Sequence, residues 1–121
     1  MANAFDRLEE LALSFPESTR VDVEAWGGEP TFRVAGKNFI FTSTEARSIT
    51  VKLGPEEAAA VVATTPGATP TGYGLGRHGW VTIPIPPRPT ASQWRELAEW
   101  VTTSYDLVAP KRLRRARPEQ A

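Results

Sequence analysis

The single histidine, His78, is where acid–base chemistry would have to begin, because the chain contains no cysteine. It lies where a glycine-rich segment runs into a predicted strand, beside Arg77 and Trp80. No constellation of catalytic partners for it is visible in the sequence. One histidine without cysteine also falls short of the several nitrogen and sulfur ligands that zinc normally takes. We therefore predict no enzyme, no metal and no cofactor, and we keep His78 as a candidate binding residue.

Aromatic and basic side chains occur together through the central part of the chain. Aromatic rings stack on bases, and lysine and arginine neutralise phosphates. Alternation along the predicted strands puts Arg33 and Lys52 on the wetter side, and Trp80 opposite Val81 and Ile83. We expect Trp80 or Tyr73 to line a partly exposed pocket with Arg33 or Arg77; the alternative is that the tryptophans are core and the cations a solvated face. The candidate residues are Trp26, Arg33, Lys37, Lys52, Tyr73, Arg77, His78 and Trp80.

Basic residues also gather close to the C-terminus. Residues 1–110 carry nine basic and 13 acidic side chains, a net charge of −4, which is unlike a uniformly basic nucleic-acid-binding domain. Residues 111–121 are predicted to be a disordered tail that would attract phosphate and whose removal would leave the fold unchanged. The tail's five basic residues are Lys111, Arg112, Arg114, Arg115 and Arg117.

Residues 64–78 form the longest irregular segment and are rich in glycine, proline and threonine. The run Gly72–Gly76 superficially resembles a phosphate-binding loop. A strand follows it, however, instead of the helix that such loops need, and there is no GK[ST] sequence. The glycines are therefore interpreted as turn residues. A loop of this length in a compact domain is often functional, and we include it in the predicted contact surface.

The elements that would position these residues begin with a predicted antiparallel meander over residues 20–53, whose first strand lies around residues 21–25. Strict alternation of apolar side chains indicates one buried face, with Phe39 and Phe41 sharing it. A further strand is predicted over Gly79–Ile85. Three amphipathic helices flank the strands, the first capped at Asn3, the second opening at Pro55, and the third capped at Thr90.

These elements predict an α+β fold in the order α-β-β-β-β-α-β-α, a twisted antiparallel sheet with helices on one face. A chain of 121 residues with 40% apolar and 23% charged residues is typical of one soluble domain, here residues 1–110. The absence of an apolar run of about 20 residues, of an apolar signal core and of cysteine favours a cytoplasmic protein without a membrane partner. The predicted core contains Leu8, Leu11, Phe32, Phe39, Phe41, Val51, Leu97 and Val101.

Several short pieces, none specific alone, recur in a characteristic order. They are Phe15-Pro16, Trp26-Gly27, Pro30–Val34, Gly36-Lys37, Phe39/Phe41, Ile49–Leu53, Pro55–Ala58, Arg77–Val81 and Ser104–Val108. Together they resemble the MmcQ/YjbR family over about residues 5–110. The resemblance implies a CyaY-like fold and DNA binding without a defined sequence target. Iron-binding members of this fold use an acidic ridge on the first helix, where this chain offers only Asp6, Glu9 and Glu10, with Arg7 between them.

The sequence thus favours a small cytosolic binding module that contacts DNA through the open sheet face and the 64–78 loop. The alternative is a module that binds a small ligand or a protein through the same surface. Affinity for DNA that falls with salt would support the first function, and affinity that is flat in salt would support the second. The sequence predicts no oligomeric state.

Overall fold

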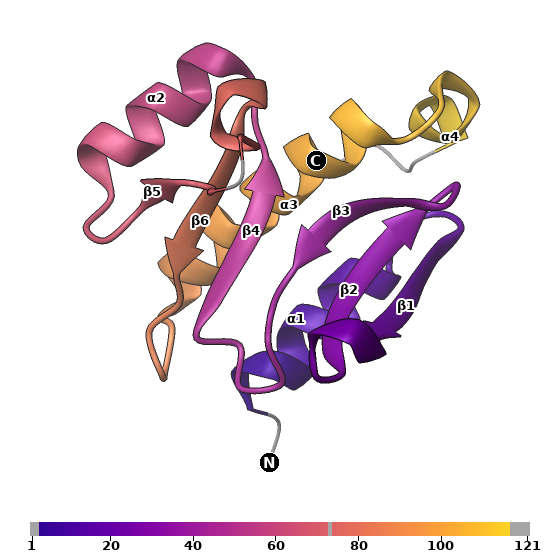
Figure 1. Ribbon diagram of the computed structural model, residues 1–121, viewed down its shortest axis with the longest axis horizontal. Helices are drawn as coiled ribbons and strands as arrows, with labels where there is room; N and C mark the ends of the chain where they lie inside the picture. The colour runs from indigo at the N-terminus through magenta and orange to yellow at the C-terminus, as the bar shows by residue number, and fades with distance from the viewer. Residues whose placement is uncertain (1–2, 73, 117–121) are drawn as a thin grey trace.

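The structure is a computed structural model that describes residues 3–72 and 74–116 (Figure 1). Six strands form one antiparallel sheet in the order β1-β2-β3-β4-β6-β5. The predicted α+β class and element order are confirmed, with β5 and α4 in addition and the first strand starting earlier.

The elements are α1 (Ala4–Leu13), β1 (Ser18–Val23), β2 (Glu29–Val34), β3 (Lys37–Phe41), β4 (Ser48–Lys52), α2 (Pro55–Thr64), β5 (Thr69–Pro70), β6 (Trp80–Pro84), α3 (Ala91–Val108) and α4 (Lys111–Ala116), with single 3₁₀ turns η1 (Glu24–Trp26) and η2 (Gly76–His78).

Helices α1 and α3 lie behind the sheet in Figure 1 and cover one of its faces, while α2 packs beside β5 and β6. The two helices α1 and α3 begin at capping boxes, with Asn3 and Thr90 as the N-caps. The helix α2 has Pro55 at its first position, where the missing N–H costs nothing. We call the face under α1 and α3 the covered face and the opposite one the open face.

The core lies between the sheet and α1 and α3. Among the predicted core residues, Leu8, Phe32, Phe39, Val51 and Val101 are fully buried and Leu97 nearly so. Leu11 and Phe41 are only half-buried. The prediction is therefore wrong for Phe41, whose side chain lies on the open face.

A β-bulge in β3 explains this error. The pairing of β2 with β3 shifts between Phe32 and Arg33, because Phe32 faces Ile40 whereas Arg33 faces Asn38. Phe39 is the extra residue, and both Phe39 and Ile40 are fully buried. A bulge interrupts the alternation of side chains between the two faces. Phe41 consequently points away from Phe39 instead of sharing its face.

The ladder between β3 and β4 is short for strands of five residues: in the described part of the chain its pairs are Ile40–Val51 and Phe41–Thr50, and Figure 1 shows the strands diverging. The buried side chain of Ser104, on α3, bridges the two strands there. Its hydroxyl accepts a hydrogen bond from the Lys52 N–H at 2.8 Å and donates one to the Phe39 carbonyl at 2.7 Å. A helix side chain thus satisfies backbone groups that a longer ladder would have paired.

The C-terminal segment differs from the predicted disordered tail over its first six residues, which form α4. Leu113 is only 3% exposed and belongs to the core cluster. Arg112 forms an ion pair with Glu17, with 2.8 Å between Nη1 and Oε2. The residues around Leu113 have no apolar periodicity, so the sequence pattern could not indicate that this leucine is buried. Residues 117–121 of the predicted tail lie outside the described residues.

Candidate binding site on the open sheet face

The open face carries an aromatic pair at its centre. Pairing of Thr50 with Phe41, and of Lys52 with Trp80, places these side chains on one face. The rings of Phe41 and Trp80 meet edge to face, with centroids 5.4 Å apart and an interplanar angle of 74°. Both residues are half-buried, so parts of the two rings remain accessible to solvent. An exposed aromatic pair of this kind offers a surface on which a planar group can stack.

One hollow of about 390 Å³ lies on one side of Trp80, where β3 and β4 diverge. Two lysines border it, Lys37 from the β2–β3 hairpin and Lys52 from the end of β4. The end of α3 reaches this hollow because the strands have separated. We call it the lysine hollow. It is lined by Gly36, Lys37, Asn38, Phe41, Lys52, Trp80, Leu107 and Val108.

A second hollow, also of about 390 Å³, lies on the other side of Trp80, beside α2. Arg77 is the one charged residue among the described residues that line it, and the Nε of Arg77 donates a hydrogen bond to the Gly74 carbonyl at 3.3 Å. We call this the apolar hollow. Among the described residues, no carboxylate lines either hollow. The apolar hollow is lined by Pro55, Ala58, Ala59, Val62, Pro70, Gly76, Arg77, Gly79, Trp80 and Val81.

Gly79 fixes the place of Trp80 between the two hollows. Its φ of +90° is a conformation that other residues rarely adopt, and an added Cβ would collide with the Leu53 carbonyl oxygen. The Gly79 carbonyl in turn accepts a hydrogen bond from the Leu53 N–H at 2.9 Å. The backbone at Gly79 and the backbone at Leu53 therefore lie in contact, and β6 begins beside the end of β4. The indole of Trp80 therefore comes from a rigid part of the sheet.

The structure brings together four of the residues predicted for the site: Lys37, Lys52, Arg77 and Trp80. The prediction that Trp80 is partly exposed and lines a pocket with Arg77 is confirmed. His78 is exposed and borders neither hollow.

The other predicted residues lie apart from the hollows or outside the description. Arg33 is half-buried beside Asn38, and its buried Nε has no partner among the described residues. In the C-terminal segment, Lys111 and Arg112 are exposed. Residues and side chains outside the description are Tyr73, Arg117 and the side chains of Trp26, Arg114 and Arg115.

Sequence reasoning missed three residues of the site. The prediction places Phe41 in the core because the bulge carries no clear sequence signal. It gives Val108 only a place on the apolar stripe of the last helix, and it gives Leu107, which is 47% exposed, no place in the site. The exposure of Leu107 follows from its position at the end of α3, beyond the short β3–β4 ladder.

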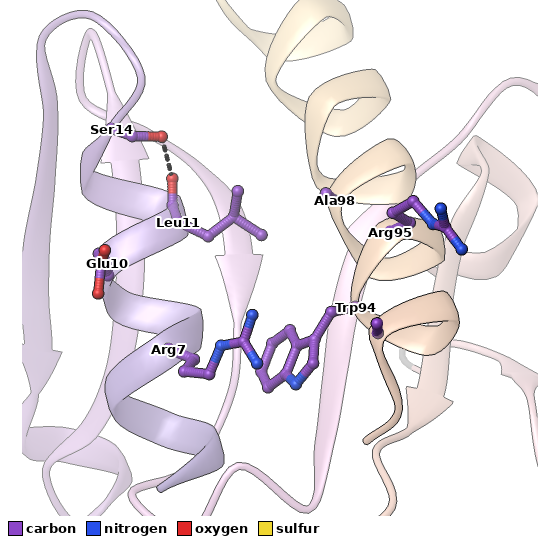
Figure 2. A pocket seen from close by; sticks show the side chains of 8 residues that line it. Arg7, Glu10, Leu11, Ser14, Trp94, Arg95 and Ala98 are labelled. Carbon is purple, nitrogen blue, oxygen red and sulfur yellow. Dashed lines mark hydrogen bonds between the residues drawn. The ribbon is translucent and has the colours of Figure 1, made fainter. Parts of the chain in front are cut away.

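A larger hollow, of about 560 Å³, lies between α1 and α3 (Figure 2). There, Arg7 extends from α1 toward Trp94 of α3, with its guanidinium carbon 4.5 Å from the ring centroid. Leu11 also points into the space between the two helices in Figure 2. This cation–π contact packs α1 against α3. None of the residues predicted for the site lines this hollow.

The resolved charge perturbations lie away from both hollows. Hydrogen bonding to Arg112 lowers the pKa of the Glu17 carboxyl. Arg20 has its pKa raised by its hydrogen bonds to Asp22 and Glu9. These are surface ion pairs, which typically contribute little to stability.

Within residues 3–72 and 74–116, no group of three or more histidine, cysteine, aspartate or glutamate side chains could hold a metal ion. In the same part of the chain, no helix is long and apolar enough to cross a membrane.

The fold and the site together define a small α+β domain, an open six-stranded antiparallel sheet with cations and aromatic rings on its uncovered face. The chain belongs to the YjbR family, whose model matches residues 13–107. It is similar in structure to the Deinococcus radiodurans protein DR2400, a DUF419 domain. The TM-score is 0.69 and the identity 22%, over 98% of this chain and 92% of that one. At this identity the likeness shows the fold alone. No curated protein matches the sequence.

Proposed function

We propose that this protein is a cytoplasmic DNA-binding module that contacts DNA through its open face. The observation that carries the proposal is the position of Trp80 between two hollows that are bordered by Lys37, Lys52 and Arg77 and by no carboxylate among the described residues. The lysines and the arginine neutralise phosphates, and the indole stacks on a base. Because a base must be unpaired and unstacked before it can stack on the indole of Trp80, we expect single-stranded DNA to bind more tightly than duplex.

The number of cations sets the strength of this interaction. Three phosphate contacts on a single strand correspond to a slope of about −2 in a plot of log K against log salt concentration. The affinity should be that of non-specific binding, with a Kd on the order of 10⁻⁴ to 10⁻⁶ M at physiological salt. Sequence preference should be slight, because every base has a face that can stack on Trp80.

The test is fluorescence anisotropy with a labelled single-stranded oligonucleotide at two salt concentrations. Arg77→Ala should weaken binding and reduce the magnitude of the salt slope by about 0.7, the share of one contact on a single strand. Trp80→Ala should weaken binding with the slope unchanged, because it removes stacking and no charge. Arg88→Ala is the matched control, since Arg88 is exposed and borders neither hollow. Wild-type protein that binds no DNA at low salt would refute the proposal.

The apolar hollow favours a second candidate function, the binding of a small ligand that carries one negative charge. Its walls are apolar apart from Arg77, and α2 closes one side. In that case Trp80→Ala should abolish binding, whereas salt should change the affinity little. The same two variants, titrated against DNA and against a library of small carboxylates, distinguish the two functions.

A further inference from the structure

Among the described residues, the strand β1 leaves one long edge of the sheet without a partner. In the order β1-β2-β3-β4-β6-β5, β1 pairs with β2 alone, over six consecutive residue pairs without a register shift. The opposite edge, β5, has only two residues. Native edges are commonly blocked by proline, by a bulge or by charged side chains; β1 contains no proline and no bulge, and its two charged residues, Arg20 and Asp22, have opposite signs and can pair with each other. Its outer side is therefore a template for another strand.

The direction of the free backbone groups follows from the bonds that β1 already makes. The Thr31 hydroxyl donates to the Val21 carbonyl at 2.7 Å, and the Gly28 N–H donates to the Val23 carbonyl at 3.0 Å. The carbonyls of Val21 and Val23 thus point toward β2. Backbone groups alternate in direction along an antiparallel strand. The N–H and C=O groups of Arg20 and Asp22 consequently point outward, away from the sheet.

We propose that β1 pairs with β1 of a second copy of this chain, antiparallel, around a two-fold axis that passes beside Val21. In this register, Arg20 of each copy faces Asp22 of the other. Each of these is a pair of residues with outward backbone groups, so each exchanges both of its hydrogen bonds. Val21 then faces Val21 across the axis as a non-hydrogen-bonded pair. The result is one continuous sheet through both copies.

Charge selects this register over its neighbours. A shift of the pairing by two residues in either direction places Arg20 opposite Arg20, or Asp22 opposite Asp22, and like charges directly opposite each other are destabilising. The proposed register places unlike charges together twice, once on each side of the axis. On the open face it joins half-buried Val21 and Val23 with Val21 and Thr19 of the other copy, and β-branched side chains pack well across strands.

Arg20 can take a second carboxylate without losing its present partners. Its guanidinium bonds Glu9 at 2.7 Å and Asp22 at 2.8 and 3.2 Å, which uses three of its five N–H donors. The guanidinium carbon lies 5.0 Å from the centre of the Phe5 ring, which holds the group in place. The fork is therefore already oriented when the Asp22 carboxylate of a second copy arrives.

Sedimentation equilibrium over a range of concentrations tests the charge pairing. Wild-type protein should show a concentration-dependent species of twice the 13.3 kDa chain mass. Arg20→Asp and Asp22→Arg should each weaken association about tenfold or more, because each acts twice across the axis. The double variant Arg20→Asp/Asp22→Arg restores unlike pairs and should recover association. A monomer at every concentration, or single variants that associate like wild type, would overturn the proposal.

A disulfide tests the register itself, since the chain has no cysteine of its own. Non-hydrogen-bonded pairs bring Cα atoms to about 4.5 Å, within the range that a disulfide bridges. Val21→Cys should therefore form a covalent dimer under mild oxidation. Thr19→Cys is the control, because the axis places the two copies of residue 19 four residues apart along the strands, roughly 13 Å. Cross-linking of Thr19→Cys but not of Val21→Cys would show that the register is wrong.

Discussion

The covered face and the open face of the sheet use the same strands in different ways. On the covered face, Phe39 and Ile40 are fully buried beneath α1 and α3. On the open face, Phe41, the next residue along β3, is half-buried beside Trp80 and a hollow. The covered face buries its apolar side chains beneath the helices, whereas the open face leaves rings and cations partly accessible to solvent. Substitutions should accordingly affect stability on one face and binding on the other.

The largest expected effect comes from comparing Phe39→Ala with Phe41→Ala. Phe39 contacts Phe15 and Tyr105 in the core, so its truncation should cost about 3–5 kcal/mol of unfolding free energy. Truncation of Phe41 should cost roughly half of this or less, because its side chain is not fully removed from water. Urea denaturation followed by circular dichroism measures both. Equal costs for the two variants would mean that the faces do not differ as described.

The bridge that Ser104 forms between β3 and β4, on the covered face, gives the second effect. Ser104→Ala leaves the Lys52 N–H and the Phe39 carbonyl without their partner, at about 1–3 kcal/mol for each unsatisfied group. Thr103→Ala is the matched control, since Thr103 is only half-buried, and it should change stability by no more than about 0.5 kcal/mol. Chemical denaturation of both variants measures the difference. A Ser104→Ala protein as stable as the control would show that water replaces the hydroxyl at the strand junction.

A smaller effect is expected where the covered face ends, at α4. Leu113→Ala should cost about 1.5–3 kcal/mol if the buried side chain contributes as a core leucine does. Removal of the chain after Pro110 should cost a similar amount while leaving DNA binding by the open face in place. Thermal unfolding of the truncated chain measures this. A truncated chain with wild-type stability would instead favour the independent tail that the sequence predicted.

The smallest effect is the pH dependence of the clip between Glu17 and Arg112. The pKa of Glu17 is lowered from its ordinary value of 4.5 by the hydrogen bond from Arg112. Its contribution to stability is therefore fully present above pH 4.5 and is lost as the pH falls through the lowered folded value. The stability difference between wild type and Arg112→Gln should shrink from pH 7 to pH 3. A difference that is constant over this range would exclude the carboxylate as its source.

The sequence predicts the features that depend on local patterns, such as helix starts, and it does not predict those that depend on one irregular residue, such as the bulge at Phe39. Capping at Asn3 and Thr90, and the helix start at Pro55, follow from local chemistry and are present in the structure. Lys37, Lys52, Arg77 and Trp80 were assigned to the site by side-chain type and parity, and they border its hollows. The inward assignment of Phe41 failed because parity cannot be carried across a bulge.

The bulge at Phe39 changes which positions of β3 face the core. Before the bulge, side chains alternate between the two faces in one order, and after it they alternate in the opposite order. Loss of one residue from the β2–β3 hairpin would restore a regular ladder in which Ile40 still faces Phe32 and Phe41 still faces Thr31, and it would turn Phe39 from the core to the open face. A relative with a hairpin one residue shorter is therefore expected to lack a large apolar residue at the position of Phe39. Sequence alignments of such relatives should be anchored at Thr50 and Trp80 and not at the hairpin. The pairing of β4 with β6, which contain these two residues, has no register shift.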